Sequence, residues 1–254
     1  MRLIVWGAGA LGGRVGSIWT QSGAPVLGFT RTPERHAELR QRGIVPALGS
    51  AVGVLTPDDA LLLALPGSTR QYAAVEALAL TQPPARAVLV SSTGYYGTPH
   101  SLVDEETTGG NDPHAHTVQA AEVAFRAWAG ASGVVLRLGG LYCSGRGPFA
   151  ALQRRGAVPP GPPDKTLALI HYDDAATATL AALRHPSPEP TYVGVVPPCP
   201  TRREFYEQAC RVAGLPEPTF HALLGLPPAV YDVTRLQRDL LPTPGHPDWH
   251  DALT

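Results

Sequence analysis

Short apolar runs alternate with longer amphipathic segments along most of the chain. The runs have strand length and are apolar throughout, which is typical of strands buried on both faces of a parallel sheet. The segments between them place apolar residues every three to four positions, as helices that cover such a sheet do. The pattern predicts strands at 2–6, 24–29, 60–65, 85–90, 133–138 and 191–196, and helices at 10–22, 33–43, 69–80, 116–130, 173–184 and 201–213.

This alternation predicts an α/β fold, with a Rossmann-type doubly wound parallel sheet and a small C-terminal substrate lobe. We expect one compact unit over residues 1–254. Its Rossmann core would comprise 1–142 plus 168–196, and the lobe 143–167 plus 197–254.

Two segments rich in glycine, proline and charge are predicted to be loops, at 98–113 and 143–166. Both follow predicted strands, so they should lie on the side where open α/β sheets bind ligands. After residue 213 the chain is interrupted repeatedly by prolines.

The composition excludes several classes of function. The net charge of −1 offers no basic field for nucleic acid or an anionic membrane. No apolar stretch reaches the about 20 residues needed to span a bilayer, and no signal-type start is present. The cysteines, Cys143, Cys199 and Cys210, are too widely spaced for a metal or CxxC motif. We therefore expect a cytoplasmic protein without a metal site that acts on a small molecule, its oligomeric state open, with a homodimer as one alternative.

The glycines at the start of the chain point to a dinucleotide. The stretch GAGALGG places Gly7, Gly9 and Gly12 in the pattern GxGxxG between a predicted strand and a predicted helix. Such glycines allow a tight turn, a close approach of a pyrophosphate, and close packing of helix on strand. The alternative is a tight turn without a ligand. The predicted cofactor loop consists of Gly7, Ala8, Gly9, Ala10, Leu11 and Gly12.

The end of the second strand indicates which dinucleotide. Sites for NAD usually carry an acidic residue here that binds the ribose 2′-hydroxyl. This chain has Thr30 and Arg31 instead, with Arg35 one helical turn further. A guanidinium suits the 2′-phosphate of NADP, so NADP is predicted and NAD is less favoured. The alternative is that both arginines are solvated surface charges.

Two further strand ends contribute predicted cofactor contacts. Leu65, Pro66 and Gly67 follow the strand at 60–65, where they would wall the adenine and ribose or simply form a turn. Ser91 closes the strand at 85–90 and is also expected at the cofactor.

In combination and in order, the motifs resemble a known family. GxGxxG is followed by SSTGYYG at 91–97, LRLGGLYCSGRGP at 136–148 and LIHYDDAA at 169–176. Together they resemble the extended and atypical short-chain dehydrogenase/reductases, and more narrowly the nucleoside-diphosphate-sugar epimerase-like members of the NAD-dependent epimerase/dehydratase family. The resemblance implies an oxidoreductase or epimerase-like enzyme acting on a small carbonyl or sugar-type substrate.

The resemblance also implies catalytic residues, and one pair is missing. The serine that orients the substrate in that family corresponds to Ser92, with Thr93 as the alternative. The family's Tyr-xxx-Lys pair would fall on His114 and Val118, counting back from Glu122. The only lysine of the chain is Lys165, so no Tyr-xxx-Lys exists anywhere. Standard proton transfer through a lysine-activated tyrosine is therefore excluded.

Three interpretations remain open. His114 would replace the tyrosine, because an imidazole exchanges protons near neutral pH without a lysine; the alternative is a loop or helix-start histidine that faces water. Alternatively Tyr95, on the rim of the strand, would act as the acid, whereas Tyr96 would pack beside the sheet or contact the substrate. The third interpretation is a non-catalytic NADP-binding redox sensor or scaffold.

Positions further along the chain were assigned from charge and from the resemblance. Arg146 and Arg235 are expected to meet an anionic substrate, with an exposed loop arginine as the alternative for Arg146. Arg137, inside a buried strand, is predicted to form a structural ion pair. The run 104–106 (DEE) is interpreted as a solvated loop face, and His171 as part of a structural segment.

Overall fold

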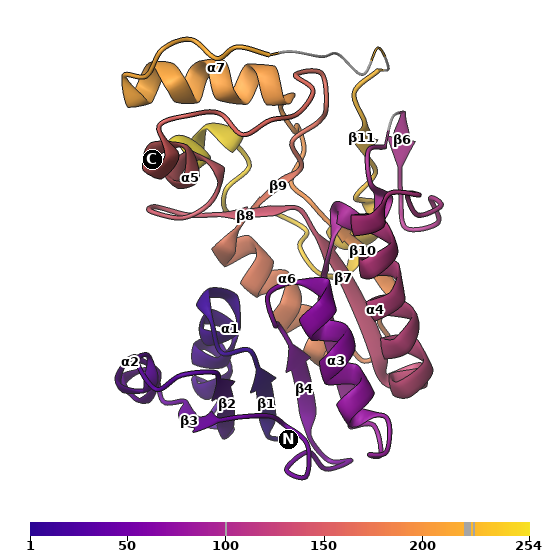
Figure 1. Cartoon of the computed structure of the whole chain (residues 1–254). Helices are drawn as coiled ribbons and strands as arrows, with labels where there is room; N and C mark the ends of the chain where they lie inside the picture. Colours follow the sequence, from indigo (N-terminus) through magenta and orange to yellow (C-terminus); the bar gives the residue numbers. More distant parts are fainter. Residues whose placement is uncertain (100, 221–224, 226) are drawn as a thin grey trace.

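A seven-stranded parallel sheet forms the centre of the protein (Figure 1). The structure is a computed structural model and describes residues 1–99, 101–220, 225 and 227–254. The strand order is β10-β7-β5-β4-β1-β2-β3. The strands are β1 (Leu3–Trp6), β2 (Val26–Thr30), β3 (Val45–Leu48), β4 (Ala60–Leu63), β5 (Arg86–Ser92), β7 (Gly133–Leu138) and β10 (Thr191–Gly194).

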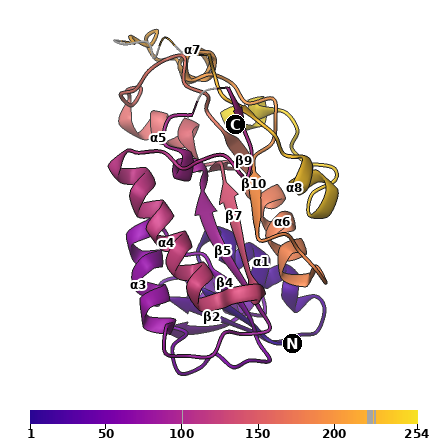
Figure 2. The same ribbon diagram turned by 90° about the vertical axis from the view of Figure 1, so that its right-hand side faces the viewer.

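Helices cover both faces of this sheet (Figure 2). On one face lie α1 (Ala10–Thr20) and α6 (Tyr172–Arg184), and on the other α3 (Ser68–Leu78) and α4 (Pro113–Ala129). Each layer has its own core, because the sheet's fully buried strand residues point alternately to the two faces: Val5 and Val88 join one cluster, Ile4 and Leu89 the other. The predicted doubly wound α/β fold is confirmed.

The sheet reverses its direction of growth between β1 and β4. From β1 the chain proceeds outward to β2 and β3, then returns to place β4 on the other side of β1. The carboxyl ends of β1 and β4 therefore flank a crevice, which is where open α/β sheets bind their ligands. This topology positions the loops after Trp6 and Leu63 around a common space.

Most predicted elements are present, with three corrections. Strand β3 was missed because it is a short edge strand, VPAL, whose residues are at most half-buried and whose Pro46 argues against a strand in the sequence. The segment predicted as a loop at 143–166 contains the helix α5 (Pro148–Arg155). Its proline stands in the first turn, where the missing N–H costs no hydrogen bond, and Phe149 and Leu152 bury one face. The other predicted loop, of which residue 100 lies outside the described residues, contains β6 (Leu102–Val103).

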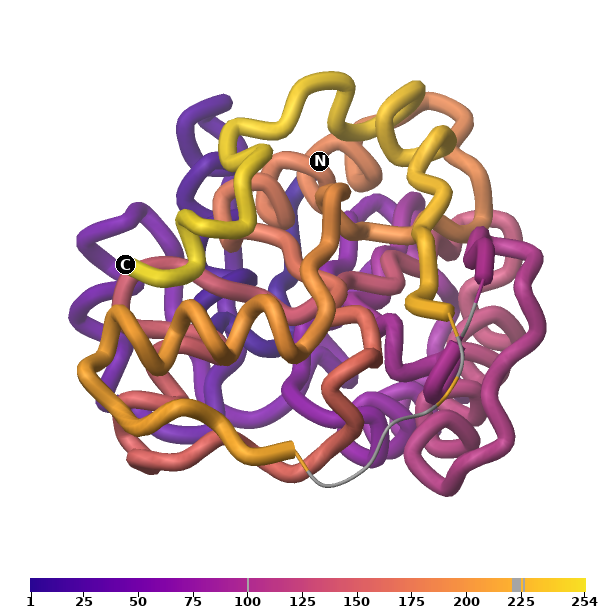
Figure 3. Tube along the Cα trace, turned by 90° about the horizontal axis from the view of Figure 1, so that it is seen from above, coloured from indigo at the N-terminus to yellow at the C-terminus, as the bar shows by residue number. Residues whose placement is uncertain are grey.

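A smaller assembly of elements lies beyond the carboxyl ends of the strands (Figures 1 and 3). Helix α7 (Arg202–Ala213) begins with a threonine cap, since Thr201 and Glu204 form a reciprocal capping box. With α5 and the 3₁₀ helix η3 (Trp249–Leu253), α7 encloses a core that includes Tyr142 and Phe205. The remaining elements are α2 (His36–Gln41), α8 (Thr234–Asp239), the 3₁₀ helices η1 (Thr93–Tyr96) and η2 (Gly130–Ser132), and the strand pairs β8 (Gly140–Tyr142) with β9 (Leu169–His171) and β6 with β11 (Val230–Tyr231).

In the part of the chain that the structure describes, no helix combines the length and the apolar character needed to cross a membrane. The expected C-terminal lobe includes residues 221–224 and 226, which lie outside the described residues.

Candidate functional site

The three glycines after β1 serve different purposes. Gly7 has φ +104°, and a Cβ there would come within 2.5 Å of the Ala64 carbonyl oxygen. A Cβ on Gly12 would overlap the carbonyl oxygen of Gly7 and lie 2.7 Å from Val5 Cγ1. A Cβ on Gly9, in contrast, would meet no protein atom closer than 4.0 Å. The fold itself therefore needs Gly7 and Gly12, whereas Gly9 keeps open the space in front of the loop.

That space is a groove made of two adjoining cavities of about 630 and 580 Å³. Both cavities are lined by Gly7, Gly9, Arg35, Leu65 and Pro66, so they meet over the glycine loop. Each cavity by itself is in the size range of small-molecule sites. The groove follows the crevice between β1 and β4.

The N-terminus of α1 opens into the second cavity. Its cap residue, Gly9, provides no side-chain hydrogen bond, and the first turn contains no acidic residue. Ala10, Leu11 and Gly12 line the cavity. Helix N-termini of this kind offer unpaired N–H groups and a positive dipole end to an anion.

The first cavity combines an apolar wall with positive charge. Trp6, Phe29 and Leu65 form part of the wall, and Ala73, Ala74 and Ala77 of α3 add small side chains. Three arginines line it, namely Arg31, Arg35 and Arg70. Among the described residues that line this cavity none is acidic. A flat apolar group carrying a phosphate fits such a lining.

The arginines of this cavity differ in how far they are already engaged. Arg35 donates to both carboxylate oxygens of Glu38, at 3.0 and 2.9 Å, and to the Ala8 carbonyl at 3.3 Å. Arg31 is exposed, and its guanidinium makes no hydrogen bond to the described residues. Thr30 Oγ1 closes the turn by donating to the Thr32 carbonyl at 2.8 Å. Arg31 is thus the predicted arginine that remains available to a ligand.

Sequence reasoning missed Arg70. It stands in the first turn of α3, where a cation faces the positive end of the helix dipole. This unfavourable position could have indicated Arg70 in the sequence as a candidate anion-binding residue, because a bound anion would offset the charge of the guanidinium. The two remaining predicted residues of this loop, Pro66 and Gly67, line the second cavity together with Leu65.

The second cavity also brings Ser92 and His114 together. Both line it, with Val118 one turn further along α4. A Cβ built on Gly94 would lie 2.7 Å from His114 Nε2 and 2.9 Å from Ser92 Oγ. Both polar atoms therefore lie above the same glycine, within reach of one bound group. Sequence counting had aligned His114 and Val118 with a Tyr-xxx-Lys pair, and the structure places both in the groove.

Ser91, beside this pair, faces a buried ion pair. Its Oγ donates to Glu122 Oε1 at 2.6 Å, although the residue also lines the cavity. Glu122 accepts in addition from Arg137 Nη2 at 3.0 Å, and both side chains are almost completely buried. The predicted structural ion pair of Arg137 is confirmed, with Glu122 as its partner.

The remaining rim residues do not line the groove. Tyr95 stacks its ring on the Arg137 guanidinium, 3.4 Å from the ring centroid. Tyr96 is buried, donates its hydroxyl proton to the Asp104 carbonyl at 2.8 Å and accepts from Arg137 at 2.9 Å. Burial raises the pKa of Tyr96 to about 12, so its hydroxyl keeps its proton at neutral pH. Thr93, at the start of η1, is also absent from the residues lining either cavity.

Lys165, from the segment before β9, hydrogen-bonds the end of the SSTGYYG stretch. Its Nζ donates to the Gly97 carbonyl at 3.1 Å and to Thr98 Oγ1 at 3.4 Å. Burial lowers the pKa of this lysine. The single lysine of the chain therefore contacts the loop after SSTGYYG and does not line the two cavities.

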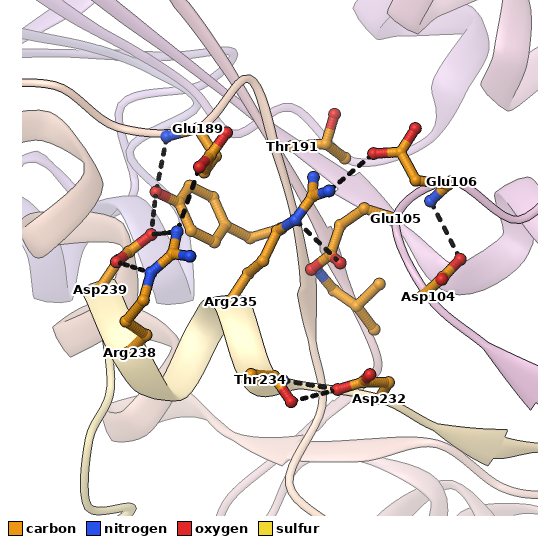
Figure 4. Close-up of polar contacts among 12 residues, drawn as sticks. Asp104, Glu105, Glu106, Glu189, Thr191, Asp232, Thr234, Arg235, Arg238 and Asp239 are labelled. Atoms are coloured by element: carbon orange, nitrogen blue, oxygen red, sulfur yellow. Dashed lines mark hydrogen bonds and ion pairs between the residues drawn. The ribbon is translucent and has the colours of Figure 1, made fainter.

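Arg235 lies on α8 and lines neither cavity, and Figure 4 shows its contacts with Glu105 and Glu106. It pairs with Glu106 at 2.8 Å and with Glu105 at 3.7 Å. The interpretation of 104–106 as a solvated face is wrong for Glu105, whose side chain is 6% exposed and accepts from the Val193 backbone N–H at 2.9 Å. The acidic residues at 104–106 thus connect the loop after β5 to β10 and α8. Arg235 is paired with Glu105 and Glu106 of this segment and does not line the cavities.

A second polar cluster lies at the N-terminus of α6. His171 caps the helix by accepting the Asp173 N–H on Nδ1, and its ring stacks on His246 with centroids 3.6 Å apart. The side-chain atoms of His171, Asp173 and His246 that could coordinate a metal ion all lie within 4.8 Å of one another. However, Nδ1 of His171 is committed to the cap, and Asp173 is paired with Arg14 at 2.9 Å. We assign this cluster a structural role that holds the C-terminal segment on α6.

The cluster predicts a pH dependence of stability. Burial, together with the neighbouring His246, lowers the pKa of His171 below its ordinary value. The unfolded chain then binds this proton more readily than the folded one, so stability falls as the pH drops below about 6.5. We expect the His171→Asn variant, which can still cap the helix, to lose less stability than the unmodified protein between about pH 7.5 and 5.5.

Urea unfolding of both proteins at the two pH values measures this difference. Titrating groups that do not contact His171 contribute equally to both proteins and cancel in the comparison. Identical losses of stability in the two proteins would contradict the assignment of the shift to His171.

Comparison with known proteins identifies the fold. No protein-family model matches the chain, and no curated protein matches it in sequence. Among solved structures, a functionally unknown conserved protein from Silicibacter pomeroyi is 22% identical with a TM-score of 0.78, over 99% of this chain and 96% of that one. A UDP-glucuronic acid 4-epimerase from Bacillus cereus, solved with UDP-glucuronic acid and NAD, is 17% identical with a TM-score of 0.78, over 100% and 96%.

A third structure is the human epimerase family protein SDR39U1, solved with NADPH. It is 22% identical with a TM-score of 0.72, over 100% of this chain and 98% of that one. These likenesses extend over the whole chain and therefore include the elements beyond the sheet as well as the sheet itself. The resemblance drawn from the motifs is thus confirmed for the fold: this chain has the Rossmann-type fold of the epimerase/dehydratase structures.

Proposed function

We propose that this protein is an NADP(H)-dependent oxidoreductase or epimerase-like enzyme of the extended short-chain dehydrogenase/reductase type, acting on a small carbonyl or sugar-type substrate. One observation carries the proposal: a single groove joins the glycine loop, unengaged arginines and the Ser92–His114 pair. Structures of the same fold have been solved with NAD or NADPH, which supports a nicotinamide cofactor.

The residues of the groove fit the parts of that cofactor. The adenine would lie in the first cavity, the 2′-phosphate at Arg31 and Arg70, and the pyrophosphate at the N-terminus of α1. The open space in front of Gly9 is not filled by any protein atom and leaves room for the pyrophosphate. Bound NADP(H) would supply or accept the hydride.

Ser92 and His114 provide the polar groups at the other end. Ser92 Oγ would donate a hydrogen bond to the reacting oxygen of the substrate, and His114 Nε2 would give or take the proton. An imidazole can do this near neutral pH without a lysine to activate it. Val118, which stands where a lysine would, leaves this task to the imidazole alone.

Hydride transfer from stereospecifically deuterated NADPH to a panel of small carbonyls tests the reaction. We expect the His114→Gln variant to lose about 10²- to 10⁴-fold in turnover, as removal of a general acid does. His116→Gln is the matched control, because His116 is exposed on the same helix and lines neither cavity. Full activity of His114→Gln would contradict the role of this histidine.

A second candidate function is NADP binding without catalysis, in a redox sensor or scaffold. The observation that favours it is Val118, because an aliphatic side chain offers the cofactor's ribose no hydrogen bond. Tight binding of NADPH by a protein that transfers deuterium to no carbonyl would support this alternative.

Arg31 is expected to determine the choice between the two dinucleotides. Hydrogen bonds to a charged group contribute about 1.5–3 kcal/mol, so Arg31→Ala should weaken NADPH binding about tenfold to hundredfold. The affinity for NADH, which has no 2′-phosphate, should stay the same. Arg40→Ala is the control, since Arg40 is exposed on α2 and lines neither cavity. Calorimetric titration measures both affinities, and equal losses for NADH and NADPH would show that Arg31 does not read the 2′-phosphate.

A further inference from the structure

Arg146 lines the second cavity from a hydrogen-bonded turn. The turn connects β8 to α5 and is closed by two hydrogen bonds, from the Arg146 N–H to the Cys143 carbonyl at 2.9 Å and from the Cys143 N–H to the Arg146 carbonyl at 3.3 Å. Gly147 has φ +102°, and a Cβ there would lie 2.7 Å from Tyr142 Cβ. The backbone that bears Arg146 is therefore held against the buried Tyr142.

Arg146 lines the same cavity as Gly9, Ala10 and Leu11. Its charge also reaches Glu38 on α2: hydrogen bonds from Arg35 lower the pKa of Glu38 most, and the charges of Arg42 and Arg146 lower it further. Arg146, which follows β8, is thus close enough to α2, beside the groove, for its charge to act on Glu38.

Arg146 is also the arginine of this cavity that has no other task. Arg35, which lines it too, is bound to Glu38 and Ala8. Arg14, on α1, is bound to Asp173 at 2.9 Å and to the Ala10 carbonyl at 3.2 Å. The Arg146 guanidinium makes no hydrogen bond or ion pair with the residues that the structure describes, and Arg146 lines the cavity into which the uncapped N-terminus of α1 opens.

We propose that Arg146 binds the pyrophosphate of the cofactor, opposite the first-turn N–H groups of α1. The inference rests on the proposed function, since it assumes a dinucleotide in the groove. The pyrophosphate would then be bound from both sides, by backbone N–H groups of the core and by a guanidinium from the β8–α5 turn. Arg146 was expected from the sequence to meet an anionic substrate, and this assignment replaces that role.

The two dinucleotides share the pyrophosphate, which gives Arg146 a signature different from that of Arg31. We expect Arg146→Gln to weaken the binding of NADPH, NADH and ADP-ribose by one common factor of about ten. Binding of adenosine 2′-monophosphate, which has no pyrophosphate, should stay unchanged. Calorimetric titration of the full chain with these four compounds measures the pattern, and Arg154→Gln on α5, exposed and outside both cavities, is the control.

The outcomes separate this inference from the proposed function. A loss confined to NADPH would assign Arg146 to the 2′-phosphate and overturn the inference. Unchanged dinucleotide affinity in the variant, with tight binding by the unmodified protein, would overturn the inference and leave the proposed function standing. Absence of dinucleotide binding by the unmodified protein would overturn both.

Discussion

Replacing Glu122 by alanine is expected to destabilise the protein by about 3–5 kcal/mol, the usual cost of removing one partner from a buried ion pair. The Arg137 guanidinium, 5% exposed, would remain in the core without its carboxylate. The Ser91 hydroxyl would lose its acceptor as well. Because Ser91 precedes Ser92 on β5, we also expect the rim of the groove to lose its order in this variant.

Urea unfolding followed by far-UV circular dichroism measures the loss. Glu76→Ala on α3 is the control, since Glu76 is exposed and surface substitutions change stability by about 0.5 kcal/mol or less. Simultaneous replacement of Glu122 and Arg137 by methionine should recover much of the loss, because no uncompensated charge then remains buried. A cost of Glu122→Ala no larger than that of the control would contradict the account of this pair.

A methyl group on Gly9 is expected to weaken dinucleotide binding about ten- to hundredfold, at a smaller cost to the fold than the same change at Gly12. The added Cβ would have no protein atom closer than 4.0 Å and would project into the space assigned to the pyrophosphate. Gly9 has φ −81°, outside the left-handed region that favours glycine, and its Cβ would be free of clashes, so alanine should cost the fold less here than at Gly12. The effect should therefore appear mainly in the affinity.

Gly12→Ala provides the matched comparison. Its Cβ would overlap the Gly7 carbonyl oxygen and lie 2.7 Å from Val5 Cγ1, so this variant should lose stability. Titration with NADPH and thermal unfolding of the two variants distinguish the roles of the glycines. A Gly9→Ala protein that binds NADPH as tightly as the unmodified chain would show that the pyrophosphate does not approach the loop at this residue.

Much of the fold could be predicted from local pattern because each central strand is buried on both faces. An apolar run such as ALLL of β4 marks such a strand directly. The pattern fails where burial is partial: β3 at the sheet edge carries a proline and exposed residues, and α5 starts within a segment whose glycines and prolines resemble a loop. The missed elements are therefore those whose structure depends on neighbours that are distant in the sequence.

The candidate site divides in the same way. The glycine loop and Arg31 could be predicted because contiguous residues form them. His114 was found only by counting from Glu122, and its proximity to Ser92 depends on how α4 packs on β5. Glu105 and Arg146 could not be placed from the sequence, because their surroundings come from β10 and from α2, far along the chain in each direction.

Calorimetric titration of the unmodified protein with NADPH and NADH tests the central claim most directly. The groove, with its arginines at the end of β2 and the open N-terminus of α1, predicts that both dinucleotides bind and that NADPH binds about tenfold or more tightly. Binding of neither dinucleotide, or tighter binding of NADH, would contradict the account.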